Sequence, residues 1–205
     1  MFLKMREALG ITNKPIDILT YIDHLGGEQK KQASDLVKRL EEDTMLEMEP
    51  QVGLAQFFQY ITTHEPDLKF TICTRNLIKP VHHLIQHHLP GVKLSEPVIT
   101  RAFDPPKPSP KPLLHISKCW GVDPKNIIMI GDSRDDMFAG LRAGCTLILM
   151  KHKDNQHLVK EIPQIDYVVE DYIQLLDVLL RGFVIKDKYI DDSRHNYKDI
   201  GYYWN

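Results

Sequence analysis

The sequence predicts an α/β fold in which helices cover both faces of a parallel sheet. From residue 50 onward, apolar β-type runs alternate with helical stretches of about a dozen residues, which is typical of βαβ units. The runs at residues 126–130 and 145–150 are almost continuously apolar. Both faces of these strands should therefore be buried beneath helices.

Length and composition limit the class of protein. The chain has 205 residues, enough for one domain with a full core and a small accessory element. Its formal net charge of -2 gives no global field that would attract nucleic acid or an anionic membrane. No run reaches the roughly 18 apolar residues of a membrane span. We therefore expect no nucleic-acid partner and no membrane partner.

The cysteines and the N-terminus indicate the compartment. Cys73, Cys119 and Cys145 are odd in number and form no Cys-x-x-Cys pair, so a reducing compartment is favoured over a disulfide framework. The first ten residues resemble neither a secretory signal nor an Arg-rich, acid-poor mitochondrial presequence. We expect a cytoplasmic protein. A mitochondrial or other organelle location, after removal of a presequence, stays open.

Residues 1–46 are predicted to be helical, with helices at 1–9, 16–25 and 28–45. The third helix carries one narrow apolar stripe, formed by Ala33, Leu36, Val37 and Leu40. Such a stripe suits a helix that lies on a larger body.

The remaining elements follow from apolar periodicity and from Gly and Pro positions. We expect helix 50–61, strand 68–74, helix 77–89, strand 97–100, an extended proline-rich loop at 104–112, helix 113–120, strand 126–130, helix 132–142, strand 145–150, strand 167–169 and helix 172–180. The chain would thus divide into a helical region (1–46), an α/β core (47–183) and a polar C-terminal tail (184–205). The tail is either disordered or laid over a surface by its aromatic residues.

Polar residues follow three of the predicted strands. In parallel α/β sheets the functional site lies at the carboxyl ends of the strands. This rule selects Thr74-Arg75-Asn76, Thr100-Arg101 and Gly131-Asp132-Ser133. We expect the site at this edge of the sheet.

The segment after strand 126–130 carries two suitably spaced carboxylates. Gly131 allows a sharp turn, Asp132 lies at the strand tip, and Asp136 follows one helical turn later on the same side. Two such carboxylates can hold Mg²⁺, directly or through water. Asp135 should point elsewhere and be solvated. The alternative is an Asp N-cap followed by acidic residues that favour the helix dipole.

Thr74 and Lys107 are the other candidates. A hydroxyl and the following backbone N–H groups at a strand tip can hold phosphate oxygens, which also makes Arg75, Asn76 and Ser133 candidate substrate-binding residues. Lys107 lies between two prolines, so its position is fixed at low entropic cost, and it could neutralise a phosphate or a carboxylate cluster. The alternatives are a strand-end threonine and a solvated loop lysine.

In order and spacing, Thr74, Lys107-Pro108-Ser109-Pro110 and Gly131-Asp132-Ser133-Arg134-Asp135-Asp136 resemble the second, third and fourth motifs of the haloacid dehalogenase-like (HAD) hydrolases. Ala139-Gly140-Leu141-Arg142-Ala143-Gly144 resembles the segment after motif four in the phosphoglycolate-phosphatase-like branch. The likeness covers about residues 50–180. It implies a Rossmann-like core, a small helical cap at residues 1–46 and Mg²⁺-dependent phosphate monoester hydrolysis.

The resemblance also implies roles for these residues. Asp132 would bind Mg²⁺ and Asp136 would support it. Lys107 would stabilise the nucleophile and the charge of the transferring phosphoryl group, and Thr74 would orient a phosphate oxygen. A small helical cap is compatible with a small phosphorylated metabolite or with a phosphoprotein.

The first motif of the family, an apolar strand followed by Asp-x-Asp-Gly-Thr, is absent from these residues. In the family its strand lies centrally, between the strands that here end at Thr74 and Ile130. We therefore expect an N-terminally truncated phosphatase that is inactive as given and binds Mg²⁺ weakly. The absence of this strand would leave a gap in the sheet. The two neighbouring strands would close the gap, another segment would fill it, or it would stay open and weaken the fold.

Two other functions remain possible. One is a non-catalytic binding or assembly subunit that contacts a protein partner through its C-terminal tail. The other is a phosphate- or nucleotide-binding domain without hydrolysis.

Two histidine-containing segments lie outside these motifs. His83 and His87 are four residues apart on a predicted helix, a spacing that zinc sites use. Without an evident third ligand, a polar helix face is the favoured interpretation. Lys151-His152-Lys153 follows a strand and could add positive charge near the site, but a solvated loop is the favoured interpretation.

Overall fold

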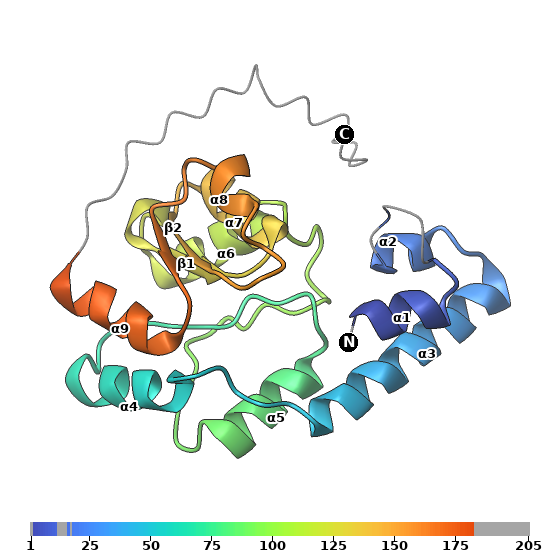
Figure 1. The fold of residues 1–205 in the computed structure, drawn as a ribbon, viewed down its shortest axis with the longest axis horizontal. Coiled ribbons are helices and arrows are strands. Elements are labelled where there is room, and N and C mark those ends of the chain that lie inside the picture. The colour runs from blue at the N-terminus through green and yellow to red at the C-terminus, as the bar shows by residue number, and fades with distance from the viewer. Residues whose placement is uncertain (1, 12–15, 17, 183–205) are drawn as a thin grey trace. The chain divides into compact units, whose positions relative to one another are not determined.

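A computed structural model describes residues 2–11, 16 and 18–182. It divides into two compact units, Met1–Gln51 with Asn76–Lys93, and Val52–Arg75 with Leu94–Asn205. The first unit is helical and the second contains the sheet (Figure 1). The predicted assignment of 184–205 as a tail falls outside the described residues.

The helical unit contains α1 (Phe2–Ala8), α2 (Ile18–Asp23), α3 (Gly27–Leu46) and α5 (Ile78–His88). Ala33 and Val37, from the predicted stripe of α3, are buried in this unit's own core, which also contains Met5, Ile11, Ile18 and Ile22. The stripe therefore packs against small helices of the same unit and needs no larger body.

Helix α5 belongs to this helical unit, although it was predicted to be part of the α/β core at residues 47–183. A Lys79–Glu42 ion pair, 2.7 Å between Nζ and Oε1, links α5 to α3. The predicted boundary at residue 46 therefore differs from the division in the structure. That these units are independent domains stays a prediction.

The second unit contains a three-stranded parallel sheet of β1 (Ile128–Gly131), β2 (Thr146–Met150) and β3 (Tyr167–Val169), in the order β1-β2-β3. Ile128 is in register with Thr146, and Ile148 with Tyr167. All five residues of the central strand are buried. The predicted parallel sheet is confirmed.

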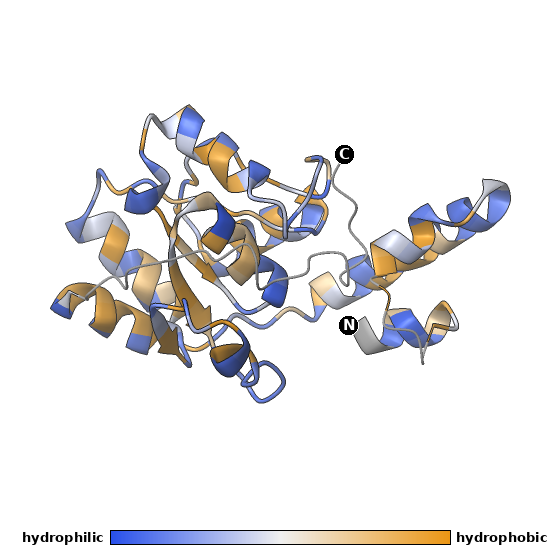
Figure 2. Cartoon of the chain, turned by 90° about the horizontal axis from the view of Figure 1, so that it is seen from above, coloured by the Kyte–Doolittle hydropathy of each residue, from blue (hydrophilic) through white to orange (hydrophobic). Residues whose placement is uncertain are grey.

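Helices cover both faces of this sheet, as predicted (Figure 2). Leu147 and Leu149 of β2 pack in a cluster with residues of α6 (Lys111–Trp120) and α7 (Arg134–Ala143). Ile148 and Met150 point to the other face, because side chains alternate along a strand. There they meet residues of α4 (Leu54–His64) and α9 (Tyr172–Arg181).

The predicted strands at 68–74 and 97–100 are much reduced. Among the described residues they form one parallel bridge, Cys73 with Ile99, supported by bonds from Thr74 N to Ile99 O and from Ile99 N to Ile72 O, both 2.9 Å. Within the part of the chain that the structure describes, β1 pairs with β2 alone. Among these described residues, the segment that ends at Thr74 is therefore not paired with β1.

Two short elements were not predicted: the 3₁₀ turn η1 (Pro124–Asn126) and α8 (Leu158–Glu161). Each has only a few residues, too few to produce a recognisable hydrophobic period. Across the described ranges, no helix is both long and apolar enough to cross a membrane.

Candidate active site

The corner after β1 is a capping box at the start of α7. Ser133 Oγ accepts a hydrogen bond from Asp136 N at 3.1 Å, and Ser133 N donates to Asp136 Oδ2 at 3.2 Å. The N-cap is therefore Ser133, and Asp132 is left out of the cap. The N–H of Ser133 donates to Asp136 and its hydroxyl oxygen accepts from Asp136 N, and its role in substrate binding stays a prediction.

Gly131 is required by the close approach of Asp136. A Cβ at position 131 would lie 2.5 Å from Asp136 Cβ and 2.6 Å from its Oδ2. These separations are shorter than any van der Waals contact. The glycine therefore lets the Asp136 carboxylate fold back over the end of β1.

Lys107 forms a buried ion pair with Asp136. The Nζ–Oδ1 distance is 2.5 Å, and the side chains are only 8% and 9% exposed. Lys107 Nζ also donates to the carbonyl oxygen of Cys73 at 2.5 Å. The alternative of a solvated loop lysine is wrong, because this ammonium connects the strand end at residue 73, the proline-rich loop and α7.

Asp132 is the accessible carboxylate of the corner. Its side chain is 56% exposed, and its Oδ2 lies 3.8 Å from His152 Nε2. Partial burial raises the pKa of Asp132, and the neighbouring charge of Asp136 raises it further, while His152 and Lys107 act in the opposite direction. His152 thus lies beside the site, although a solvated loop was the favoured interpretation of Lys151-His152-Lys153.

Asn155 is a site residue that sequence analysis missed. Its Nδ2 donates to Asp132 O at 2.8 Å and to Met150 O at 2.9 Å, and its Oδ1 accepts from His152 N at 2.8 Å. Asn155 is 4% exposed. It joins the loops after β1 and β2. All three partners are backbone groups, so no local sequence pattern reveals the role.

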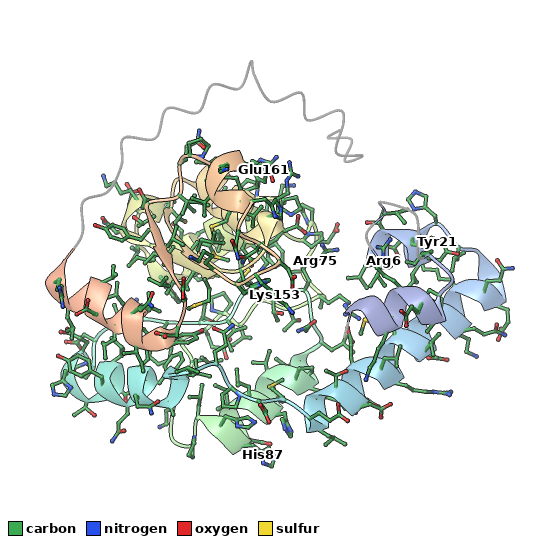
Figure 3. The ribbon with its side chains drawn as sticks, in the orientation of Figure 1. Arg6, Tyr21, Arg75, His87, Lys153 and Glu161 are labelled. Atoms are coloured by element: carbon green, nitrogen blue, oxygen red, sulfur yellow. The ribbon has the colours of Figure 1, made fainter. Side chains whose placement is uncertain are left out.

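Arg75 and Asp135 form a second ion pair, with 2.7 Å between Arg75 NH1 and Asp135 Oδ2. The prediction that Asp135 is solvated is wrong, since its side chain is 29% exposed and paired with this guanidinium. Arg101, also selected by the strand-end rule, donates from Nε to Arg75 O at 2.9 Å. Figure 3 labels Arg75 and the loop residue Lys153.

Thr74 lies where predicted, half-buried at the end of its short strand segment, with its N–H bonded to Ile99 O. Asn76 begins the segment Asn76–Lys93 of the helical unit. The structure therefore assigns Thr74 and Arg75 to the α/β unit with Lys107, Asp132 and Asp136, and Asn76 to the other unit.

The donor set fits a weakly held Mg²⁺. Across the described residues, no group of three or more His, Cys, Asp or Glu side chains could hold a metal ion. Mg²⁺ nevertheless needs only one or two carboxylates, since it keeps several waters and takes phosphate oxygens. The raised pKa of Asp132 reflects in part its like-charged neighbour Asp136, a repulsion that a cation would relieve. Asp132 is the accessible carboxylate, and Asp136 is paired with Lys107.

Comparison with known proteins defines the class. The model of the haloacid dehalogenase-like hydrolase family matches residues 6–150, so the chain belongs to this family. An uncharacterized hydrolase of Saccharomyces cerevisiae is 40% identical over 182 residues, which cover 87% of this chain and 83% of the relative. A haloacid dehalogenase-like hydrolase domain-containing protein of Arabidopsis thaliana is 32% identical over 66% of this chain and 54% of its own length.

A phosphoglycolate phosphatase of Haemophilus influenzae is 31% identical over 99 residues, 48% of this chain and 40% of that enzyme. The chain thus spans most of the yeast relative but about half or less of the other two.

Solved structures confirm the fold. A hydrolase from Pseudomonas syringae has a TM-score of 0.68 at 20% identity, covering 88% of this chain and 90% of that one. A HAD hydrolase of family IA, variant 3, from Entamoeba histolytica has a TM-score of 0.62 at 20% identity, covering 87% and 89%. The protein is a HAD-family hydrolase with the predicted α/β fold.

Proposed function

We propose that this chain carries the metal- and phosphate-binding part of a Mg²⁺-dependent phosphate monoesterase. The observation that carries the proposal is the buried Lys107–Asp136 pair, anchored on Cys73 O, beside the exposed carboxylate of Asp132. A cation, two carboxylates and strand ends are what a site for phosphate and a hard metal ion requires. The similarity to a phosphoglycolate phosphatase favours the same class of reaction.

Each residue of this site would have a distinct role. Asp132 would hold Mg²⁺, which when bound supplies Lewis-acid polarisation of a phosphoryl oxygen. Lys107 keeps Asp136 in place and adds positive charge where phosphoryl charge develops. Thr74 orients a phosphate oxygen through its hydroxyl, next to the backbone N–H of Arg75. Ser133 acts by fixing Asp136.

The nucleophile would come from outside these residues. Phosphoryl transfer through an aspartyl phosphate needs a carboxylate nucleophile, and no Asp-x-Asp follows an apolar strand in the sequence. We expect the chain as given to be inactive. We expect activity when an upstream strand ending in Asp-x-Asp lies beside β1. The substrate would be a small phosphorylated metabolite or a phosphoprotein.

The test begins with the nucleotide sequence upstream of Met1, which should encode an apolar run ending in Asp-x-Asp. The chain extended by that segment should hydrolyse p-nitrophenyl phosphate in the presence of Mg²⁺ but not EDTA. Asp132→Asn should abolish turnover, whereas Asp154→Asn, an exposed change in the loop after β2, should leave it intact. An upstream frame without such a run, or an extended chain without Mg²⁺-dependent turnover, would contradict the proposal.

A non-catalytic assembly subunit is the second candidate. Among the described residues, β1 pairs along one edge only, and Ile128 on that strand is 37% exposed. An open strand edge is a surface on which another chain can add a strand. This candidate predicts an inactive extended chain and a partner contact that is lost when residues 184–205 are deleted. Turnover that disappears in Asp132→Asn excludes it.

A further inference from the structure

Helix α5 carries a histidine cluster that the phosphatase site does not use. Its four members are His82, His83, His87 and His88. The rings of His83 and His87, one helical turn apart, have centroids 4.3 Å apart and planes inclined by 31°. The ring of His88 is farther away, with its centroid 6.0 Å from that of His83.

The separation of the two nearer rings suits a shared metal ion. A zinc–imidazole bond is about 2.0–2.1 Å long, so two nitrogens on one ion lie about 3 Å apart. Rings whose centroids are 4.3 Å apart can bring their rim nitrogens to that separation by side-chain rotation alone. His87 is exposed and its side chain points away from α5 (Figure 3), and His83 is partly exposed.

The electrostatic surroundings also permit a cation. The neighbouring cation Lys79, one turn earlier, is paired with Glu42 at 2.7 Å. Its charge is therefore compensated.

We propose that His83 and His87 chelate a divalent late first-row transition ion, Cu²⁺, Ni²⁺ or Zn²⁺, on the surface of the helical unit. Water completes the coordination, because the described residues offer no cluster of three suitable side chains. Imidazole pairs prefer these ions and bind Cu²⁺ most tightly, whereas Mg²⁺ prefers oxygen ligands. The site is therefore independent of the acidic corner at Asp132.

The experiment is a calorimetric titration of the untagged chain with Ni²⁺ and then with Cu²⁺. It is made in a Cys119→Ser background, because Cys119 Sγ and His115 Nε2, 3.7 Å apart, form another pair that could bind the ions. His83→Ala and His87→Ala should each weaken the tightest site by about 100-fold, since each removes one arm of a chelate. Mg²⁺ should not compete with these ions for the histidine site, because it prefers oxygen ligands such as the carboxylate of Asp132.

His82→Ala is the matched control. It lies next to His83 on the same helix, is exposed, and points to a different side of the helix. It should leave the affinity within about twofold, because it removes neither arm of the chelate. His83→Gln, which keeps a polar side chain of similar reach, should behave like His83→Ala. Unchanged affinity in His83→Gln or His87→Ala, or an equal loss in His82→Ala, would overturn the proposal.

Discussion

At the residue scale, the Lys107–Asp136 pair organises the site. Its ammonium lies between a carboxylate and the carbonyl of Cys73, and both charged groups are more than nine-tenths buried. Burying two charges costs several kcal/mol, which their attraction and their further hydrogen bonds offset. Removing one of the two charges should therefore destabilise the fold by more than the intact ion pair stabilises it.

We predict that Lys107→Met lowers the free energy of unfolding by about 3–5 kcal/mol, because it leaves the Asp136 carboxylate buried without its cation. Urea denaturation followed by circular dichroism measures this loss. Lys111→Met, four residues later and exposed, is the matched control and should change stability by less than about 0.5 kcal/mol. Equal effects of the two variants would mean that the buried pair is not formed.

Asn155 carries the second prediction at this scale. Asn155→Ala removes three hydrogen bonds: the bond to Asp132 O, which joins the loops after β1 and β2, and two local bonds, to Met150 O and from His152 N, at and after the end of β2. Unfolding free energy should fall by about 1–3 kcal/mol. Asn126→Ala, an exposed asparagine, should be close to neutral.

The same Asn155→Ala chain should bind Mn²⁺ more weakly by about tenfold or more, because Asn155 holds the backbone of Asp132, the proposed metal ligand. Restored stability in an osmolyte without restored Mn²⁺ affinity would separate positioning of Asp132 from general loosening. A variant that loses stability but keeps its Mn²⁺ affinity would contradict the positioning role.

At the element scale, α7 packs unusually close to the sheet at Gly140. A Cβ at this position would lie 2.5 Å from Leu147 Cδ2 and 2.9 Å from Met129 Cβ. Alanine is a better helix former than glycine by about 1 kcal/mol, so without this contact Gly140→Ala would stabilise α7. Overpacking costs about 1–3 kcal/mol. We therefore predict a lower melting temperature for Gly140→Ala, and a higher one would show that α7 lies farther from β1 and β2.

Among the elements, the buried strands could be predicted from the sequence, but the pairing of the other two segments could not. The runs that became β1 and β2 were predictable, because strands buried on both faces are continuously apolar. The segments at 68–74 and 97–100 have equally strand-like sequences but form one bridge, Cys73 with Ile99. Pairing depends on neighbouring strands, which a local pattern does not report.

The candidate site was predictable to a similar extent. The spacing of Asp132 and Asp136 and the proline-flanked Lys107 identified the residues that the structure brings together at this corner. Their partners were not predictable. The pairing of Asp135 with Arg75 and the bond of Asn155 to Asp132 O depend on which loops meet. The capping role of Ser133, in contrast, is local to the Ser133-x-x-Asp136 pattern.

At the scale of the whole molecule, the chain is a HAD-family hydrolase whose described residues form a three-stranded parallel sheet. The helical unit and the α/β unit each have their own core. The two proposed metal sites belong to different units. The imidazole ligands are in the helical unit and the carboxylates are in the α/β unit. They should therefore respond to different ions and to different variants.

The central claim is that the corner at residues 131–136 binds a hard divalent cation through Asp132. Electron paramagnetic resonance of Mn²⁺ added to the chain as given tests it directly. We predict one weak site that Mg²⁺ displaces and that weakens as the pH falls from about 7 to 4, because protons compete for the same carboxylate. Asp132→Asn should abolish it, whereas Asp135→Asn, three residues away and paired with Arg75, should retain it. Unchanged Mn²⁺ binding in Asp132→Asn would contradict the account.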